Sequence, residues 1–290
     1  MGRISLPRIS QNEPRKTIDI HLDLTYCALE WTDRPVLDES NRIVNGLWIG
    51  NKLSKLELLT LSSFVANHHE FHLWTYSEIV TPLCSGVVVR NAEEILPRDA
   101  VYRRVGTDLE TGVGNGSFAG FSDLFRYKLL YEKGGYWADM DMTCLKPLDF
   151  PEPYVFRPHR VGVVGNLMKC PRGALLMRLT LERAQQAIDS GWHFGNRALS
   201  QTVLELGLER YVRSGICNPD SWHGFVQSLI EEDVPIPPEL YAIHWINEFW
   251  RTVAQNDGFY RGKKVLSQVP DKNNARPGTT LARLYARYNL

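Results

Sequence analysis

No apolar run in the 290-residue sequence reaches the roughly 20 residues that a membrane-spanning helix needs. The N-terminal residues also lack the apolar core of a secretory signal peptide. Leu6 stands where the myristoylation pattern that begins at Gly2 requires Ser or Thr. We therefore expect no membrane span, while peripheral contact with a membrane stays open.

An excess of charge of either sign is also missing, and cysteine is sparse. The 33 basic and 33 acidic side chains give a formal net charge of +0, and no long basic run indicates a nucleic-acid partner. The cysteines are odd in number, scattered, and without the Cys-x-x-Cys spacing of zinc sites; they are Cys27, Cys84, Cys144, Cys170 and Cys217. This usage argues for a reducing compartment, so we expect a cytoplasmic protein.

What the sequence does have is an alternation of strand-like and helix-like segments. Strands are predicted at 43–49, 71–76, 86–90, around Tyr136 and at 161–168, and helices at 53–67, after 121, from about 171 and at 197–213. Such alternation is typical of an α/β domain with a mostly parallel central sheet, in which ligands bind at the carboxyl ends of the strands.

The length of the chain favours a single domain. We place a peripheral segment at 1–42, the domain at 43–270 and a C-terminal tail or helix at 271–290. The second half of the chain is expected to be richer in helix than the first.

Residues 121–142 combine a helix, a Gly-Gly stop and a strand that ends in two aspartates. Ser122 or Asp123 is expected to cap the helix with a side-chain oxygen. Asp123 also shares a helix face with Arg126, because residues three apart are neighbours on a helix surface. Such a pair is often an ordinary surface ion pair, worth only about 0.3–0.5 kcal/mol.

Asp139 and Asp141 close this segment with carboxylates in alternate positions. In an extended strand alternate side chains point the same way, so both carboxylates are predicted to face one site. Paired carboxylates are hard oxygen ligands for Mg²⁺ or Mn²⁺, which complete their coordination shells with phosphate oxygens of a substrate. The pattern therefore predicts a Mn²⁺ or Mg²⁺ site suited to a diphosphate leaving group.

The same segment resembles the Asp-x-Asp glycosyltransferases of the sugar-binding-region family, which includes the yeast initiating mannosyltransferase and the animal alpha-1,4-galactosyltransferases. It is also similar to the catalytic domain of the large clostridial glucosylating toxins. The residues that match the family pattern are Ser122, Asp123, Arg126, Leu130, Tyr131, Gly134, Gly135, Asp139 and Asp141, with Trp137 where the family has Tyr.

The resemblance implies a GT-A-like fold and a metal-dependent, retaining transfer of a hexose from a UDP- or GDP-linked sugar. It implies catalytic roles for Asp123, Arg126 and Asp141, with Asp139, Asp141 and the later His244 as ligands of Mn²⁺ or Mg²⁺. The acceptor is expected to be a glycan, a lipid-linked sugar or a protein, and polysaccharide biosynthesis is the expected setting. The implied donor-binding residues are Trp48, Ser122, Asp123, Arg126, Tyr136, Asp139, Asn166, Asn247 and Trp250.

Some of these residues have a plainer interpretation as well. Trp48 belongs to a short apolar strand, and a buried core tryptophan is as good an interpretation as stacking on a nucleotide base. His244 stands in an aromatic segment at 241–250, so a packed core histidine rivals a metal ligand.

Two other functions fit parts of the sequence. Asp139 to Thr143 also spells Asp-x-Asp-x-Thr, which is similar to the nucleophile motif of haloacid-dehalogenase-type phosphatases, with Asp139 as the nucleophile. The Ser122, Asp123 and Arg126 helix has no role in that scheme. A non-catalytic nucleotide-sugar-binding module is the other alternative, and it would keep the metal site without turnover.

Overall fold

The computed structural model describes residues 41–105, 115–160, 162–189, 195–220, 222–247, 250–251, 259–260, 263–264 and 271–290. They belong to one compact unit that runs from Arg34 to Leu290. The peripheral segment expected at 1–42 falls almost wholly outside the described residues, and the boundaries expected at 42 and 270 stay predictions.

A six-stranded sheet forms the centre of this unit, with strands in the order β3-β2-β1-β4-β7-β6. Strands β3, β2, β1 and β4 run parallel, whereas β7 and β6 pair antiparallel with their neighbours. The bounds are Ile43–Trp48 for β1, Glu70–Thr75 for β2, Val87–Asn91 for β3, Gly135–Ala138 for β4, Val155–His159 for β6 and Gly162–Cys170 for β7. This confirms the α/β fold with a mostly parallel central sheet that the GT-A-like resemblance implied.

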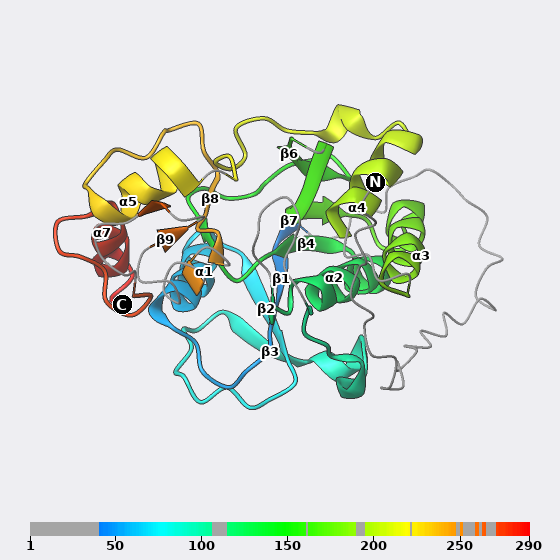
Figure 1. Cartoon of the computed structure of the whole chain (residues 1–290), viewed down its shortest axis with the longest axis horizontal. Helices are drawn as coiled ribbons and strands as arrows, with labels where there is room; N and C mark the ends of the chain where they lie inside the picture. The colour runs from blue at the N-terminus through cyan, green and yellow to red at the C-terminus, as the bar shows by residue number, and fades with distance from the viewer. Residues whose placement is uncertain are drawn as a thin grey trace, which may run out of the picture. The chain divides into compact units, whose positions relative to one another are not determined.

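Helices lie on both sides of the sheet (Figure 1). On one side are α2 (Ala119–Lys133), α3 (Leu175–Asp189) and α4 (Gly195–Glu205), and on the other are α1 (Lys55–Ala66), α5 (Gln227–Glu231) and α7 (Thr280–Arg287). Two small antiparallel pairs join β5 (Met142–Cys144) to β8 (Ala242–His244) and β9 (Phe259–Tyr260) to β10 (Lys263–Lys264). Short 3₁₀ turns lie at Ala92–Glu94, Arg98–Ala100 and Glu209–Tyr211, and a π-turn lies at Trp222–Val226.

The two faces of β4 contact different parts of the core, because strand side chains alternate. Tyr136 packs with Phe71 of β2 and Phe64 of α1 in one apolar cluster. Trp137 points to the other face, where its ring lies 6.3 Å from the ring of Phe125 in α2. The side of β4 that carries Trp137 is therefore the side that meets helix α2.

Two helix ends differ from those expected from the sequence. Helix α2 begins at Ala119, and its cap residue Phe118 makes no side-chain cap bond, so the prediction that Ser122 or Asp123 caps the helix is wrong. Ser122 already donates its backbone N–H to the carbonyl oxygen of Phe118 at 2.8 Å. Helix α4 ends at Glu205 instead of reaching 213, since Gly207 adopts φ of 62°, a left-handed conformation that stops a helix.

The described part of the second half mixes helices with strands β6, β7 and β8, so the expected enrichment in helix is not clearly shown. Within the same described residues, no helix combines the length and the apolar character that crossing a membrane requires.

Candidate functional site

The aspartates at 139 and 141 lie in a turn that follows β4, at the carboxyl end of the parallel strands. The backbone N–H of Asp139 donates to the carbonyl oxygen of Asn166 in β7 at 2.8 Å. The carbonyl oxygen of Asp141 accepts from the backbone N–H of Trp245 at 2.9 Å. A turn anchored on both sides, and not the strand alternation expected from sequence, therefore sets the direction of the two carboxylates.

Arg126 links helix α2 to this turn. Its Nη2 lies 2.8 Å from Oδ1 of Asp123 and 3.4 Å from Oδ1 of Asp139, and only 4% of its side chain is exposed. Trp137 donates its indole N–H to the same Asp139 oxygen at 2.7 Å, and the guanidinium lies 5.2 Å from the Trp137 ring. Asp123 and Arg126 thus form a buried cluster with Asp139 instead of an isolated surface ion pair.

The carboxylates of this cluster have perturbed pKa values. Burial raises the pKa of Asp123 to about 6, although Arg126 acts in the opposite direction. Burial likewise raises the pKa of Asp139; Arg126 opposes this rise, and repulsion from Asp141 adds to it. Asp139 and Asp141 are neighbouring carboxylates whose negative charges repel each other. A cation between them would relieve that repulsion.

Gly165 of β7 makes room for Arg126. A Cβ atom at this position would lie 2.4 Å from Nη1 of Arg126. The register of β6 on β7 shifts next to this position, between Phe156 and Arg157. Nothing in the sequence around Gly165 indicated this role, because the clash depends on a helix that lies some 40 residues earlier in the chain.

We expect Gly165→Ala to lower kcat by about 100-fold, since a misplacement of about 1 Å in a catalytic cluster has that effect. Steady-state kinetics together with a thermal melt would test this. Gly162→Ala is the matched control, because Gly162 begins the same strand, its new methyl group meets Ser200 instead of Arg126, and its φ of 110° is strained. The control should lose stability but keep kcat, and equal kcat losses in both variants would contradict a specific role for Gly165.

His244 joins the site from strand β8. Its Nε2 lies 3.4 Å from Oδ2 of Asp141, and its Nδ1 lies 2.5 Å from Oδ1 of Asp220. Burial lowers the pKa of His244, but the carboxylates of Asp141 and Asp220 outweigh burial and raise the pKa to about 10. Burial raises the pKa of Asp141, but His244 and the backbone N–H of Asn247, 2.5 Å away, outweigh burial and leave the pKa lowered.

The chemistry of these side chains fits a divalent cation. Oδ2 of Asp139 and Oδ1 of Asp141 make no hydrogen bond or ion pair with another described residue. The other oxygen of each carboxylate is bound: Oδ1 of Asp139 by Trp137 and Arg126, and Oδ2 of Asp141 by His244 and Asn247. In the described part of the chain, no three His, Cys, Asp or Glu side chains are already drawn together as a metal cluster. Two free carboxylate oxygens are nevertheless the usual protein contribution to a Mg²⁺ or Mn²⁺ site.

Comparison with known proteins identifies the segment that holds these aspartates. Residues 115–156 match the family model described as glycosyltransferase sugar-binding region containing DXD motif. This segment is similar to a glycosyltransferase sugar-binding region. The match includes helix α2, the Gly-Gly stop and the turn with Asp139 and Asp141, and it confirms the enzyme class expected from the sequence. No curated protein matches the chain.

Several solved glycosyltransferases show weak structural likeness to the chain. PaToxG glycosyltransferase has 11% identity and a TM-score of 0.42, over 57% of this chain and 68% of that one. Mouse xyloside xylosyltransferase 1 has 10% identity and a TM-score of 0.38, over 71% of this chain and 98% of that one. GlyE of Streptococcus pneumoniae has 14% identity and a TM-score of 0.35, over 71% and 54%. Likeness at this level decides neither fold nor function.

Four further residues with an expected donor contact lie on elements that surround the turn with Asp139 and Asp141. Asn166 accepts the backbone N–H of Asp139 with its carbonyl oxygen, and its Nδ2 lies 3.2 Å from Nδ1 of His244. Its Oδ1 is buried and has no hydrogen-bond partner. Asn247 reaches Asp141 through its backbone N–H. Ser122 is half-buried in the first turns of α2, and Trp48 is partly buried at the carboxyl end of β1, where its indole N–H donates to the Lys52 carbonyl oxygen at 2.9 Å.

Two expected donor contacts lie in the core instead. Tyr136 has no exposed surface and packs on the face of β4 opposite Trp137 and Asp139. Trp250 is 2% exposed and packs with Trp245, to whose carbonyl oxygen its indole N–H donates at 2.9 Å. Both aromatic rings therefore belong to the core of the described structure. Strand parity could have indicated this for Tyr136, since Trp137 and Asp139 are two apart and Tyr136 is out of phase with both.

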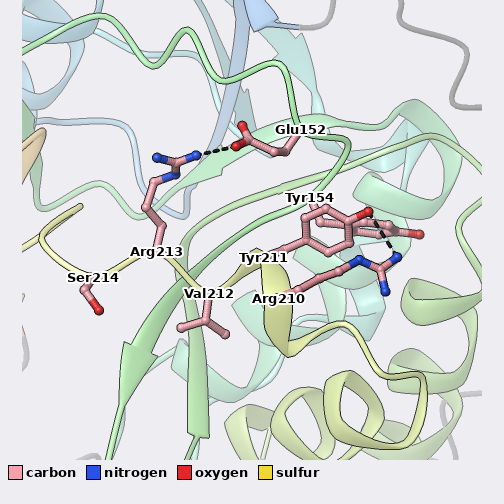
Figure 2. Close-up of a pocket in the computed structure, with 7 residues that line it drawn as sticks. All are labelled: Glu152, Tyr154, Arg210, Tyr211, Val212, Arg213 and Ser214. Atoms are coloured by element: carbon pink, nitrogen blue, oxygen red, sulfur yellow. Dashed lines mark hydrogen bonds and ion pairs between the residues drawn. The ribbon is translucent and has the colours of Figure 1, made fainter.

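A separate pocket lies at the other end of the sheet (Figure 2). Its lining residues are Glu152, Tyr154, Arg210, Tyr211, Val212, Arg213 and Ser214. Val155, next to Tyr154, pairs with Lys169, which in turn pairs with Tyr136 near the start of β4. The pocket is therefore remote from the turn that follows the end of β4, and it is not part of the candidate site.

Proposed function

We propose that this glycosyltransferase moves a hexose from a nucleoside-diphosphate sugar to an acceptor with the help of Mn²⁺ or Mg²⁺. The observation that carries the proposal is the meeting of three segments that are distant in sequence. Helix α2 brings Asp123 and Arg126, the turn after β4 brings Asp139 and Asp141, and β8 brings His244. Acidic side chains, one arginine and one histidine thus face a single location at the carboxyl edge of the sheet.

The proposed roles follow from the contacts of each side chain. Asp139, Asp141 and His244 would hold the cation, which supplies Lewis-acid stabilisation of the charge that develops on the departing diphosphate. Asp123 accepts hydrogen bonds from sugar hydroxyl groups, because its carboxylate is 17% exposed beside Arg126. Arg126 fixes the carboxylates of Asp123 and Asp139 relative to each other.

The donor is proposed to be a UDP- or GDP-linked sugar, with Trp48, Ser122, Asn166 and Asn247 as further contacts. Retention of anomeric configuration is proposed from the family resemblance alone. A glycan, a lipid-linked sugar or a protein remains the proposed acceptor, with polysaccharide biosynthesis as the setting. The cytoplasmic location stays a prediction from cysteine usage; the four cysteines that the structure describes are free.

The phosphatase alternative finds less support. Its motif would end at Thr143, which is fully buried and accepts the indole N–H of Trp245 at 2.8 Å. Its nucleophile would be Asp139, one oxygen of which already binds Trp137 and Arg126. Thr143 therefore acts as a core residue, and only the two aspartates of that motif remain near the site.

Calorimetric titration with a panel of UDP- and GDP-sugars, with Mn²⁺ and then with excess chelator, tests the proposal. We expect one donor to bind with metal and to lose most of its affinity after chelation, and slow metal-dependent hydrolysis of that donor. Metal-dependent phosphatase activity that Asp139→Asn abolishes, with no donor binding, would favour the phosphatase instead. Donor binding with neither hydrolysis nor transfer would leave a binding module.

A further inference from the structure

We infer that Asp220 positions His244 for the cation, and that Arg157 in turn holds Asp220. The inference rests on the proposed function, and it adds a residue that no sequence motif marked. Asp220 does not reach the turn with Asp139 and Asp141 itself; it acts through the imidazole, so it is a positioning residue and not a catalytic one.

The two ring nitrogens of His244 have different neighbours. Nδ1 lies 2.5 Å from Oδ1 of Asp220 and 3.2 Å from Nδ2 of Asn166, and Nε2 lies 3.4 Å from Oδ2 of Asp141. Of the two groups at Nδ1, the Asp220 carboxylate is the closer and the charged one. When a carboxylate accepts the proton of one imidazole nitrogen, the other nitrogen presents its lone pair, which is the form that binds metals. Once the ring is neutral, as a metal ligand must be, Asp220 therefore holds its one proton on Nδ1, and the free Nε2 faces the proposed cation site.

The backbone of His244 is fixed from the same segment. Asn218 accepts the backbone N–H of His244 with its Oδ1 at 2.7 Å and donates from Nδ2 to the His244 carbonyl oxygen at 3.1 Å. Asn218 is 1% exposed. Asn218 and Asp220 are two residues apart, so one short segment fixes both the backbone and the ring of His244.

Arg157 accounts for the placement of Asp220. Its side chain is 1% exposed, its Nη1 lies 2.7 Å from Oδ1 of Asp220, and its Nη2 donates to the Asn218 carbonyl oxygen. Among the residues that the structure describes, Asp220 is the only carboxylate within ion-pair distance of Arg157. A buried arginine needs a charged partner, so Arg157 holds the Asp220 carboxylate in place beside the His244 ring. His159 also lies near this carboxylate, with Nε2 3.7 Å from Oδ2 of Asp220.

The test measures Mn²⁺ affinity by electron paramagnetic resonance on the full chain without donor. We expect Asp220→Asn, which keeps the shape of the side chain, to weaken Mn²⁺ binding by about 10- to 100-fold, the usual effect of removing such an outer partner. Asp233→Asn is the control, because Asp233 is an exposed aspartate that pairs with Arg283 at 2.9 Å, and it should not change the affinity.

A double-variant cycle separates positioning from a general loss of structure. In the His244→Ala background, Asp220→Asn should cause no further loss of Mn²⁺ affinity. An equal loss in both backgrounds, or wild-type affinity in Asp220→Asn, overturns the inference. If Asp139→Ala and Asp141→Ala also leave the Mn²⁺ affinity unchanged, the proposed metal site itself is rejected. If those two variants lose Mn²⁺ affinity and Asp220→Asn does not, only the role of Asp220 is rejected.

A measurement on the unaltered protein covers the case in which Asp220→Asn fails to fold. With ¹⁵N-labelled histidine and saturating Mg²⁺, the nitrogen signals of His244 should show a proton on Nδ1 and none on Nε2. The His244→Ala variant identifies the nitrogen signals of His244, because these signals are absent from its spectrum. A proton on Nε2 in the loaded protein would overturn the inference without any change at Asp220.

Discussion

Replacing Asp141 with asparagine should lower kcat by about 100- to 1,000-fold, the usual loss when one group that stabilises developing charge is removed. The side chain is 6% exposed and its Oδ2 accepts the backbone N–H of Asn247. An asparagine oxygen can keep that bond, so the variant removes the charge and little else. Mn²⁺ affinity should fall together with kcat, because half of the carboxylate pair is gone.

The stability of Asp141→Asn should fall together with its activity. Burial raises the pKa of Asp141, but His244 and the backbone N–H of Asn247 favour its charged form and leave the pKa lowered, so this charge contributes to stability, although its repulsion of Asp139 offsets part of the contribution. We therefore expect a melting temperature below that of the wild type at neutral pH. Asp149→Asn, at an exposed aspartate nearby, is the control for kinetics and melting. Full activity of Asp141→Asn with unchanged metal dependence would sink the proposed role.

Replacing Arg126 with alanine should lower the free energy of unfolding by about 3–5 kcal/mol, because it leaves buried carboxylates without a partner. Asp123 and Asp139 both depend on this guanidinium, and it also packs over the Trp137 ring. Denaturant titration measures the loss. Transferase activity should disappear with it, since both carboxylates lose the group that fixes their positions.

Arg178→Ala is the matched control for Arg126→Ala. Arg178 pairs with Glu182 one helical turn away at 3.0 Å, but the two side chains are 27% and 34% exposed. Its removal should cost only about 0.3–0.5 kcal/mol. Similar losses in the two variants would contradict a buried cluster at Arg126.

The deficit of Arg126→Ala should depend on pH in a defined direction. Burial already raises the pKa of Asp123 to about 6 while Arg126 opposes it, so without Arg126 the folded-state pKa rises further. The folded variant then binds more protons than the unfolded chain, and its stability increases as the pH falls. The gap to the wild type should therefore narrow as the pH falls toward about 6, where Asp123 of the wild type also takes up its proton, and a gap that widens on acidification would contradict this account.

Local patterns were enough to place the main elements and half of the site. The apolar spacing of β1, β2 and α2 follows from residues that are neighbours in the chain, so strand and helix periods reveal it. Asp123 and Arg126 share a helix face for the same local reason. The Asp-x-Asp pattern predicted the glycosyltransferase class, because the residues that match the sugar-binding region all fall within one short segment.

The sequence by itself therefore determined the α/β alternation, the sugar-binding segment and the pair of aspartates, all of which depend on short-range spacing. Only the tertiary structure decided that Trp250 belongs to the core, that Gly165 must leave room for Arg126, and that Asp220 reaches His244. Each of these depends on which elements pack face to face. That choice is made by contacts between segments far apart in the chain, where spacing carries no information.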